Sequence, residues 1–226
     1  MKKILRFGLP VLAVVLFINS AASAQGVLNE ILKRMDAQNK SLTSLRAGVT
    51  MVKENAQLGD TETTQGKVLY LPQRSGNPFV RIDWVKPDES LAVVNKQYVI
   101  YRPRLGQAYT GTTDTATGNA KAGGALAFLN MSKTQLKANY DVQYLGEATL
   151  SNGAKTWHLQ MTPKTAASYK SAEVWVDKDG FPVQSRIVEA NKDATTVLLS
   201  NLEKNVTINA AVFKIELPKG TKIIKG

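Results

Sequence analysis

The sequence predicts a mainly β protein of about ten or eleven antiparallel strands joined by short turns. From Leu45 onward, apolar residues alternate with polar ones, which is the period of a half-buried strand. Turn signals such as Asn152-Gly153 and Asp179-Gly180 recur at a spacing of roughly ten residues. No internal repeat, long linker or shift in composition separates a second domain. This pattern favours one large curved sheet, a barrel or a sandwich.

The first 24 residues have the layout of a secretory signal peptide. A basic segment precedes an apolar run over residues 7–18, which is too short to span a bilayer, and a small-x-small cleavage site ends at Ala24. The next residue is Gln25, whereas a bacterial lipoprotein would need a cysteine there to carry its lipid. We therefore expect a signal peptide over residues 1–24 and a single soluble domain over residues 25–226, released into the periplasm.

Composition excludes several kinds of chemistry. The 226 residues include no cysteine, so disulfides, thiolate metal sites and thiol nucleophiles are ruled out. The net charge is +11, and removal of the predicted signal peptide leaves +8. Such a charge suits an anionic membrane surface, an acidic partner or simple solubility. Because the lysines are scattered and the chain is exported, we expect no nucleic-acid partner, no cofactor and a monomer.

The first segment after the predicted cleavage site reads as an amphipathic helix. Leu28, Ile31, Leu32 and Met35 follow the i, i+3, i+4, i+7 spacing that places side chains on one face of a helix. The strands then follow in order, with apolar alternation at these positions: Val49 and Met51; Val68 and Tyr70; Val80, Ile82 and Trp84; Trp157, Leu159 and Met161; Thr195, Val197 and Leu199.

One stretch breaks the strand pattern midway along the chain. Residues 112–121 are rich in Thr, Gly, Asn and Ala, and read as a loop. Residues 122–130 then read as a short helix or apolar flap, and Ser132 is placed to cap a further helical turn. We expect these insertions to cover one mouth of a barrel.

No catalytic or metal-binding group stands out. His158 is the only histidine, and alternation places it on the face opposite Trp157, so we interpret it as a surface-facing strand residue. The run from Asp177 to Gly180 lacks the ligand pattern of a calcium loop and reads as a hairpin turn. The sequence therefore predicts no enzyme and no metal site. A concave β structure of this size often encloses an apolar ligand.

Four segments, in this order and spacing, resemble the LolA family of periplasmic lipoprotein carriers. They are residues 86–103, which begin Lys-Pro-Asp-Glu-Ser; residues 173–184, which contain Asp-Lys-Asp-Gly; residues 201–205; and residues 213–220, which read Phe-x-x-x-x-Pro-x-Gly. The resemblance implies an unclosed, half-barrel sheet of about eleven antiparallel strands, with an N-terminal helix and short lid helices over a concave apolar face. In that family the cavity holds the acyl chains of a lipoprotein.

The resemblance also implies where the site lies. The cavity wall would be formed by apolar strand residues: Val68, Tyr70, Val80, Ile82, Trp84, Val99, Trp157, Leu159 and Met161. The lid would be formed by Leu126, Phe128 and Leu129. In the family an arginine holds the lid closed by hydrogen bonds to lid carbonyls. Its nearest match here is Arg74, and Arg81 is the competing position.

The implied function is a soluble carrier that takes lipoproteins from the inner to the outer membrane. Its partners would be acylated lipoproteins, an inner-membrane lipoprotein-releasing complex and an outer-membrane acceptor. An alternative is a binding module of the same shape that senses lipoproteins or carries another lipid or glycolipid. A third reading, an envelope hydrolase, would require a pair of carboxylates inside the cavity.

Overall fold

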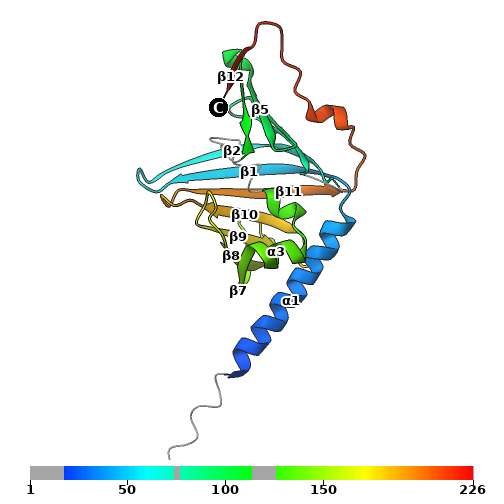
Figure 1. Cartoon of the computed structure of the whole chain (residues 1–226), viewed down its shortest axis with the longest axis vertical. Coiled ribbons are helices and arrows are strands. Elements are labelled where there is room, and N and C mark those ends of the chain that lie inside the picture. Colours follow the sequence, from blue (N-terminus) through cyan, green and yellow to red (C-terminus); the bar gives the residue numbers. More distant parts are fainter. Residues whose placement is uncertain (1–17, 74–76, 114–125, 226) are drawn as a thin grey trace, which may run out of the picture.

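The computed structural model describes residues 18–73, 77–113 and 126–225. Its centre is a single strongly curved sheet of twelve strands (Figure 1). The strands are β1 Leu45–Asn55, β2 Asp60–Leu71, β3 Phe79–Trp84, β4 Glu89–Val94, β5 Gln97–Arg102, β6 Gln107–Thr112, β7 Tyr140–Thr149, β8 Lys155–Pro163, β9 Ser171–Val176, β10 Pro182–Val188, β11 Ala194–Lys204 and β12 Lys222–Lys225.

The sheet is not closed into a barrel. Its order is β12-β6-β5-β4-β3-β2-β1-β11-β10-β9-β8-β7, so β12 and β7 form two separate edges. All neighbouring strands are antiparallel except β12 and β6, which run parallel. The predicted mainly β, unclosed fold is therefore confirmed.

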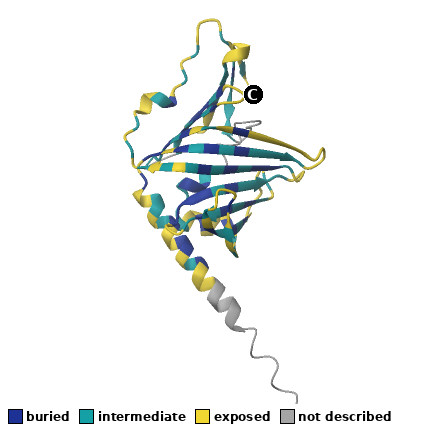
Figure 2. Ribbon diagram, turned by 180° about the vertical axis from the view of Figure 1, so that it is seen from behind, coloured by how far each residue is buried: buried dark blue, intermediate teal, exposed yellow. Residues whose placement is uncertain are grey.

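Burial alternates along the strands, as the two-residue period predicts (Figure 2). In β3, for example, Val80, Ile82 and Trp84 are buried, while Arg81 and Asp83 are half-buried on the other face. The buried side chains form the apolar face of the sheet, and the short helices within residues 126–139 pack on this same face together with α1. We call it the concave face.

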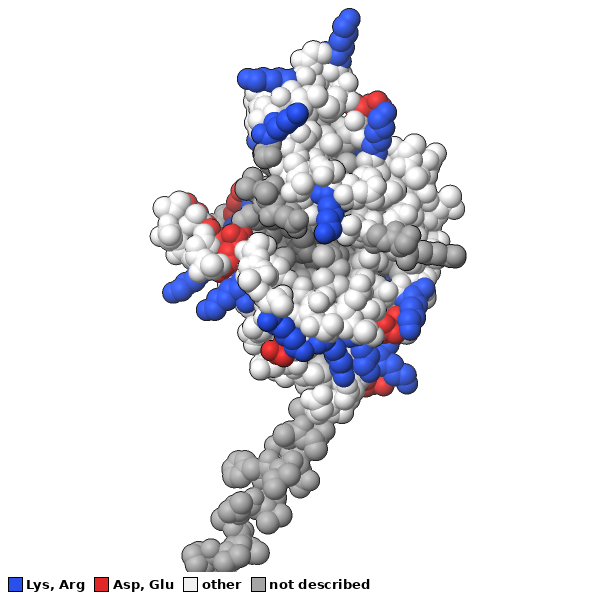
Figure 3. Space-filling view, viewed as in Figure 1, with Lys and Arg blue, Asp and Glu red and all other residues white. Residues whose placement is uncertain are grey.

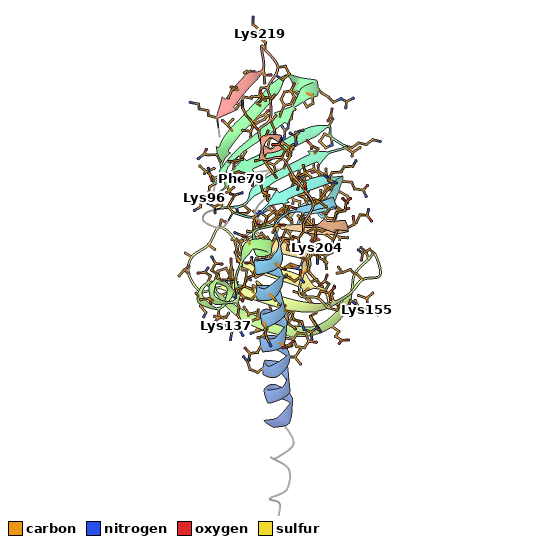
Figure 4. All side chains as sticks on the ribbon, turned by 90° about the vertical axis from the view of Figure 1, so that its right-hand side faces the viewer. Phe79, Lys96, Lys137, Lys155, Lys204 and Lys219 are labelled. Atoms are coloured by element: carbon orange, nitrogen blue, oxygen red, sulfur yellow. The ribbon has the colours of Figure 1, made fainter. Side chains whose placement is uncertain are left out.

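Helix α1, Ile18–Ser41, lies across the end of the concave face (Figure 4). The predicted stripe is confirmed: Leu28, Ile31, Leu32 and Met35 are all buried and pack with residues of β8 and β9. The predicted cleavage point after Ala24 falls inside this helix, four residues before the buried Leu28. Among the described residues, no helix combines the length and apolar character needed to cross a membrane.

The predicted insertion forms two short helices over the concave face. They are η4, a 3-10 helix over Leu126–Asn130, and α3, Lys133–Asn139. Ser132 caps α3 as expected: its hydroxyl accepts from the Gln135 backbone N–H at 3.2 Å, and the Gln135 side chain accepts from the Ser132 backbone N–H at 2.9 Å. We refer to residues 126–139 as the lid. The loop predicted over residues 112–121 falls almost wholly outside the described residues.

The C-terminal segment contains an element that the sequence pattern does not predict. After β11 the chain forms the 3-10 helix η5, Ala210–Phe213, and then adds β12 to the edge of the sheet. The Phe213 ring is buried against the Phe79 ring, with centroids 5.9 Å apart. Arg81 Nη1 donates to the Val212 carbonyl at 2.8 Å. The segment that contains η5 thus packs on the face of the sheet opposite the lid.

Candidate functional site

Most of the predicted wall residues lie side by side on the concave face. Strand register places Val68 opposite Ile82, Ile82 opposite Leu91, and Leu91 opposite Ile100. A second row, beside the first, runs from Tyr70 through Val80 and Val93 to Tyr98. Each of these residues is at most 6% exposed. The two rows make an apolar surface that is continuous over four strands.

Val99 is the wall residue whose position differs from the prediction. It pairs with Ala92 and is half-buried, whereas its neighbours Tyr98 and Ile100 are the buried residues of β5. Adjacent residues of a strand point to opposite faces, so Val99 lies on the convex face. The concave positions of β5 are Tyr98 and Ile100.

The remaining three wall residues lie on the concave face but beneath α1. Leu159 and Met161 are fully buried against the apolar stripe of α1. Trp157 is half-buried, and the Arg34 guanidinium of α1 lies 5.3 Å from its ring centroid. The predicted wall is thus divided between a first cluster, which extends over β1 to β5, β10 and β11, and a second cluster, which α1 covers.

The lid joins the two clusters. Leu126 and Leu129 pack with the first cluster, and Phe128 packs with the second. The cavities directly beneath η4 measure about 10 Å³ each, which is room for about one water molecule. The lid therefore rests directly on the sheet, and an acyl chain would have to displace it to lie there.

Polar contacts from α1 hold the lid in this position. Asn39 Nδ2 donates to the Leu129 carbonyl at 3.1 Å, and the Asp36 carboxylate accepts the Lys133 backbone N–H at 3.1 Å. A hydrogen bond from Lys40, followed by that backbone N–H, lowers the pKa of Asp36. This carboxylate therefore stabilises the closed lid above its ordinary pKa, and the stabilisation is lost as pH falls through the lowered value.

Neither predicted lid arginine is seen to hold the lid. Arg74 lies outside the described residues. Arg81 is on the convex face, where Nε donates to Asp83 at 2.9 Å and Nη1 donates to the Val212 carbonyl. Because Arg81 alternates with the buried Val80 and Ile82, it cannot reach the concave side. Among the described residues, the η4 carbonyl of Leu129 accepts from Asn39, and the α3 carbonyl of Lys137 accepts from Lys164 Nζ at 2.7 Å.

Substituting Asn39 by alanine is expected to loosen the lid. Loss of one hydrogen bond to a half-buried carbonyl should raise the open population about fivefold, since such a bond contributes about 1 kcal/mol. Hydrogen exchange measured by mass spectrometry should show faster exchange in peptides covering residues 126–139. Lys33→Ala, an exposed change on the same helix, is the control. Equal lid exchange in both variants would contradict the role of Asn39.

One end of the concave face is polar, which the sequence did not indicate. Glu89 is wholly buried and accepts a hydrogen bond from Arg102 Nε at 2.6 Å. This bond raises the pKa of Arg102, whose guanidinium also lies 4.8 Å from the Tyr109 ring centroid. At the other end of the face, burial raises the pKa of the Tyr70 hydroxyl. The apolar surface therefore includes one buried carboxylate, Glu89, whose partner Arg102 is partly exposed.

His158 lies on the convex face, as predicted, but it is held by partners. Its Nε2 is 2.8 Å from Glu173, and its ring stacks on Trp175 with centroids 4.3 Å apart. Arg186 reaches Glu173 at 3.4 Å and Glu54 at 2.7 Å. These ion pairs link β8, β9, β10 and β1, which is a structural arrangement on the outer surface.

Positive charge is spread over the surface. On the face that Figure 3 shows, lysine and arginine side chains project from both ends of the molecule rather than forming one patch. Lys137 and Lys155 project from the half that contains α1, and Lys219 lies at the far end of the other half (Figure 4). Charge spread in this way does not mark a single binding surface for an anionic partner on this face.

Comparisons with known proteins agree with this fold. An uncharacterised conserved protein from Thermus thermophilus has a TM-score of 0.54 and 16% identity, with 88% of this chain and 99% of that chain covered. MucB has a TM-score of 0.51 and 15% identity, with 86% of this chain and 63% of that chain covered. At these identities the likeness shows the fold alone. No curated protein matches the chain.

A family model gives the assignment. The model described as outer membrane lipoprotein carrier protein LolA matches residues 42–216, which run from the end of α1 to the segment after η5. The matched residues include the lid and β1 to β11, and so all the strands that form the concave face. The chain belongs to the LolA family of outer membrane lipoprotein carrier proteins.

Proposed function

We propose that this protein is a soluble periplasmic chaperone that binds the acyl chains of lipoproteins on its concave face and carries them from the inner to the outer membrane. The observation that carries the proposal is an apolar face, continuous over β2 to β5, next to a lid held by a few hydrogen bonds. Covering such a face with acyl chains needs no covalent chemistry. Family membership supports a lipid-binding role.

The energetics favour a site that is closed at rest. Burial of an acyl chain yields roughly 0.8 kcal/mol per methylene, so several long chains would exceed the ceiling of about 20 kcal/mol on non-covalent affinity. A carrier must also release its cargo. Lifting Leu126, Phe128 and Leu129 off the sheet exposes apolar surface and opposes binding, which lowers the net affinity to a reversible range.

The test is whether the exported protein carries lipoprotein. Purified from an envelope fraction and examined by native mass spectrometry, it should retain acylated lipoprotein, and the added protein should release lipoproteins from inner-membrane vesicles. Absence of both would overturn the proposal. A bound lipid or glycolipid without lipoprotein would instead favour the sensing or lipid-carrying module.

The hydrolase reading receives no support from the described residues. Among them, Glu89 is the one buried carboxylate, and it is paired with Arg102. A glycosidase needs two carboxylates facing each other across a cleft. We therefore propose a binding function without catalysis.

A further inference from the structure

Three buried polar atoms at one end of the concave face have no hydrogen-bond partner in the structure. They are Thr64 Oγ1, Trp84 Nε1 and Glu89 Oε1. Their residues are only 1%, 3% and 1% exposed, respectively. A buried donor or acceptor left without a partner costs about 1–3 kcal/mol, more when it is charged. Three such atoms together indicate a place where a ligand supplies the missing partners.

Strand register places these three residues next to one another on the concave face. Trp84 is directly opposite Gly66 on one side and Glu89 on the other, and Glu89 in turn lies beside Arg102. Thr64 is two residues from Gly66 on β2 and so is a diagonal neighbour of Trp84 on the same face. Gly66 has no side chain, and a Cβ there would meet the backbone of Asp83 and Trp84. Tyr70 Oη is also unpartnered, but its residue lies four positions further along β2.

The unpartnered atoms indicate which hydrogen-bond donors and acceptors the ligand group must have. Glu89 keeps one oxygen on Arg102, and its other oxygen requires an N–H or O–H donor. The Trp84 indole N–H requires an acceptor, and the Thr64 hydroxyl can do either. The carboxylate and the guanidinium already balance each other, so no net charge is required of the ligand. An amide, with one N–H and one carbonyl, meets these requirements in a single neutral group.

We propose that Thr64, Trp84 and Glu89 form a subsite for an amide group attached to an acyl chain, with the chain itself lying along the neighbouring apolar rows. In this arrangement the amide N–H donates to Glu89 Oε1, and the amide carbonyl accepts from Trp84 Nε1. The subsite makes the protein prefer N-acylated amines to lipids that carry only esters. The inference rests on the proposed function, since it assumes that acyl chains enter the concave face.

The test compares two probes that differ in one group. N-methylpalmitamide has a donor and an acceptor, whereas methyl palmitate has only acceptors. Both compete with a fluorescent acyl probe for the full exported protein. The amide should bind about tenfold more tightly than the ester, the equivalent of one hydrogen bond to a charged group. Trp84→Phe, which removes the indole donor, should weaken both probes to the same extent.

A double variant tests the role of Glu89 Oε1 as the acceptor for the amide N–H. Glu89→Met with Arg102→Leu removes both charges and keeps apolar volume, and this kind of replacement is often tolerated. It should bind the two probes equally, whereas Tyr101→Phe, on the other face of β5, should keep the preference for the amide. Equal affinity of the unaltered protein for amide and ester would overturn the subsite and leave acyl binding intact. Failure of both probes to bind would instead overturn the proposed function.

Discussion

Replacement of Arg102 by leucine alone is expected to destabilise the protein by about 3 kcal/mol, the low end for a broken buried pair, because the Arg102 side chain is 38% exposed and water can partly replace it. The Glu89 side chain is 0% exposed and depends on Arg102 Nε, 2.6 Å away, for its only charge partner among the described residues. Without the guanidinium, a carboxylate would stay buried among Leu91, Trp84 and their neighbours with no compensating charge. The measurement is the midpoint of urea-induced unfolding, which should fall while the slope of the transition stays the same.

The control for this prediction is the double variant already described. Glu89→Met with Arg102→Leu should regain most of the stability lost in Arg102→Leu, because no unpaired charge remains. The two substitutions would then be strongly non-additive. If the double variant were as unstable as the single one, packing by the Arg102 stem, rather than its charge, would be the cause.

Much of the fold follows from local sequence patterns. The two-residue period gave the correct face for Val68, Ile82 and Leu159, because each alternates with clearly polar or less buried neighbours. The same period could not place Val99, which stands between Tyr98 and Ile100 in a run that is apolar on both faces. Only the pairing of β5 with β4 decides which of them faces inward.

The polar parts of the site could not be predicted in the same way. Glu89 follows Pro87-Asp88 in the sequence and has the appearance of a solvated turn residue, yet it is the first residue of β4 and is buried. Its partner Arg102 is at the end of the next strand, so the pair exists only once the register is fixed. The contact of Asn39 with Leu129 likewise joins residues 90 positions apart. Contacts of this kind depend on tertiary structure rather than on local pattern.

The turn between β9 and β10 packs directly against the backbone of α1. Gly180 has φ +89°, and a Cβ placed there would lie 2.4 Å from the Arg34 carbonyl carbon of α1. Arg34 Nη1 also donates to the Lys178 carbonyl at 2.8 Å. Asp177 accepts the backbone N–H groups of Asp179 and Phe181, which explains the acidic residue without a bound calcium ion. The turn therefore supports α1 through direct backbone packing and the hydrogen bond from Arg34.

Substitution of Gly180 by alanine should consequently cost far more than the same change in an ordinary turn. Gly153 provides the matched control: its φ is +83°, and a Cβ there meets nothing within 4 Å. Gly153→Ala should lose about 1 kcal/mol through backbone strain alone. Gly180→Ala adds a clash with the main chain of α1, and we expect a loss of about 3 kcal/mol or more, in the range typical of overpacking on top of strain.

Thermal unfolding measures the stability lost in both variants, and limited proteolysis should cut α1 sooner only in Gly180→Ala. Equal losses of stability in the two variants would mean that α1 shifts to make room for the added methyl group. Contact with this turn would then not be what holds α1 over Leu159 and Met161.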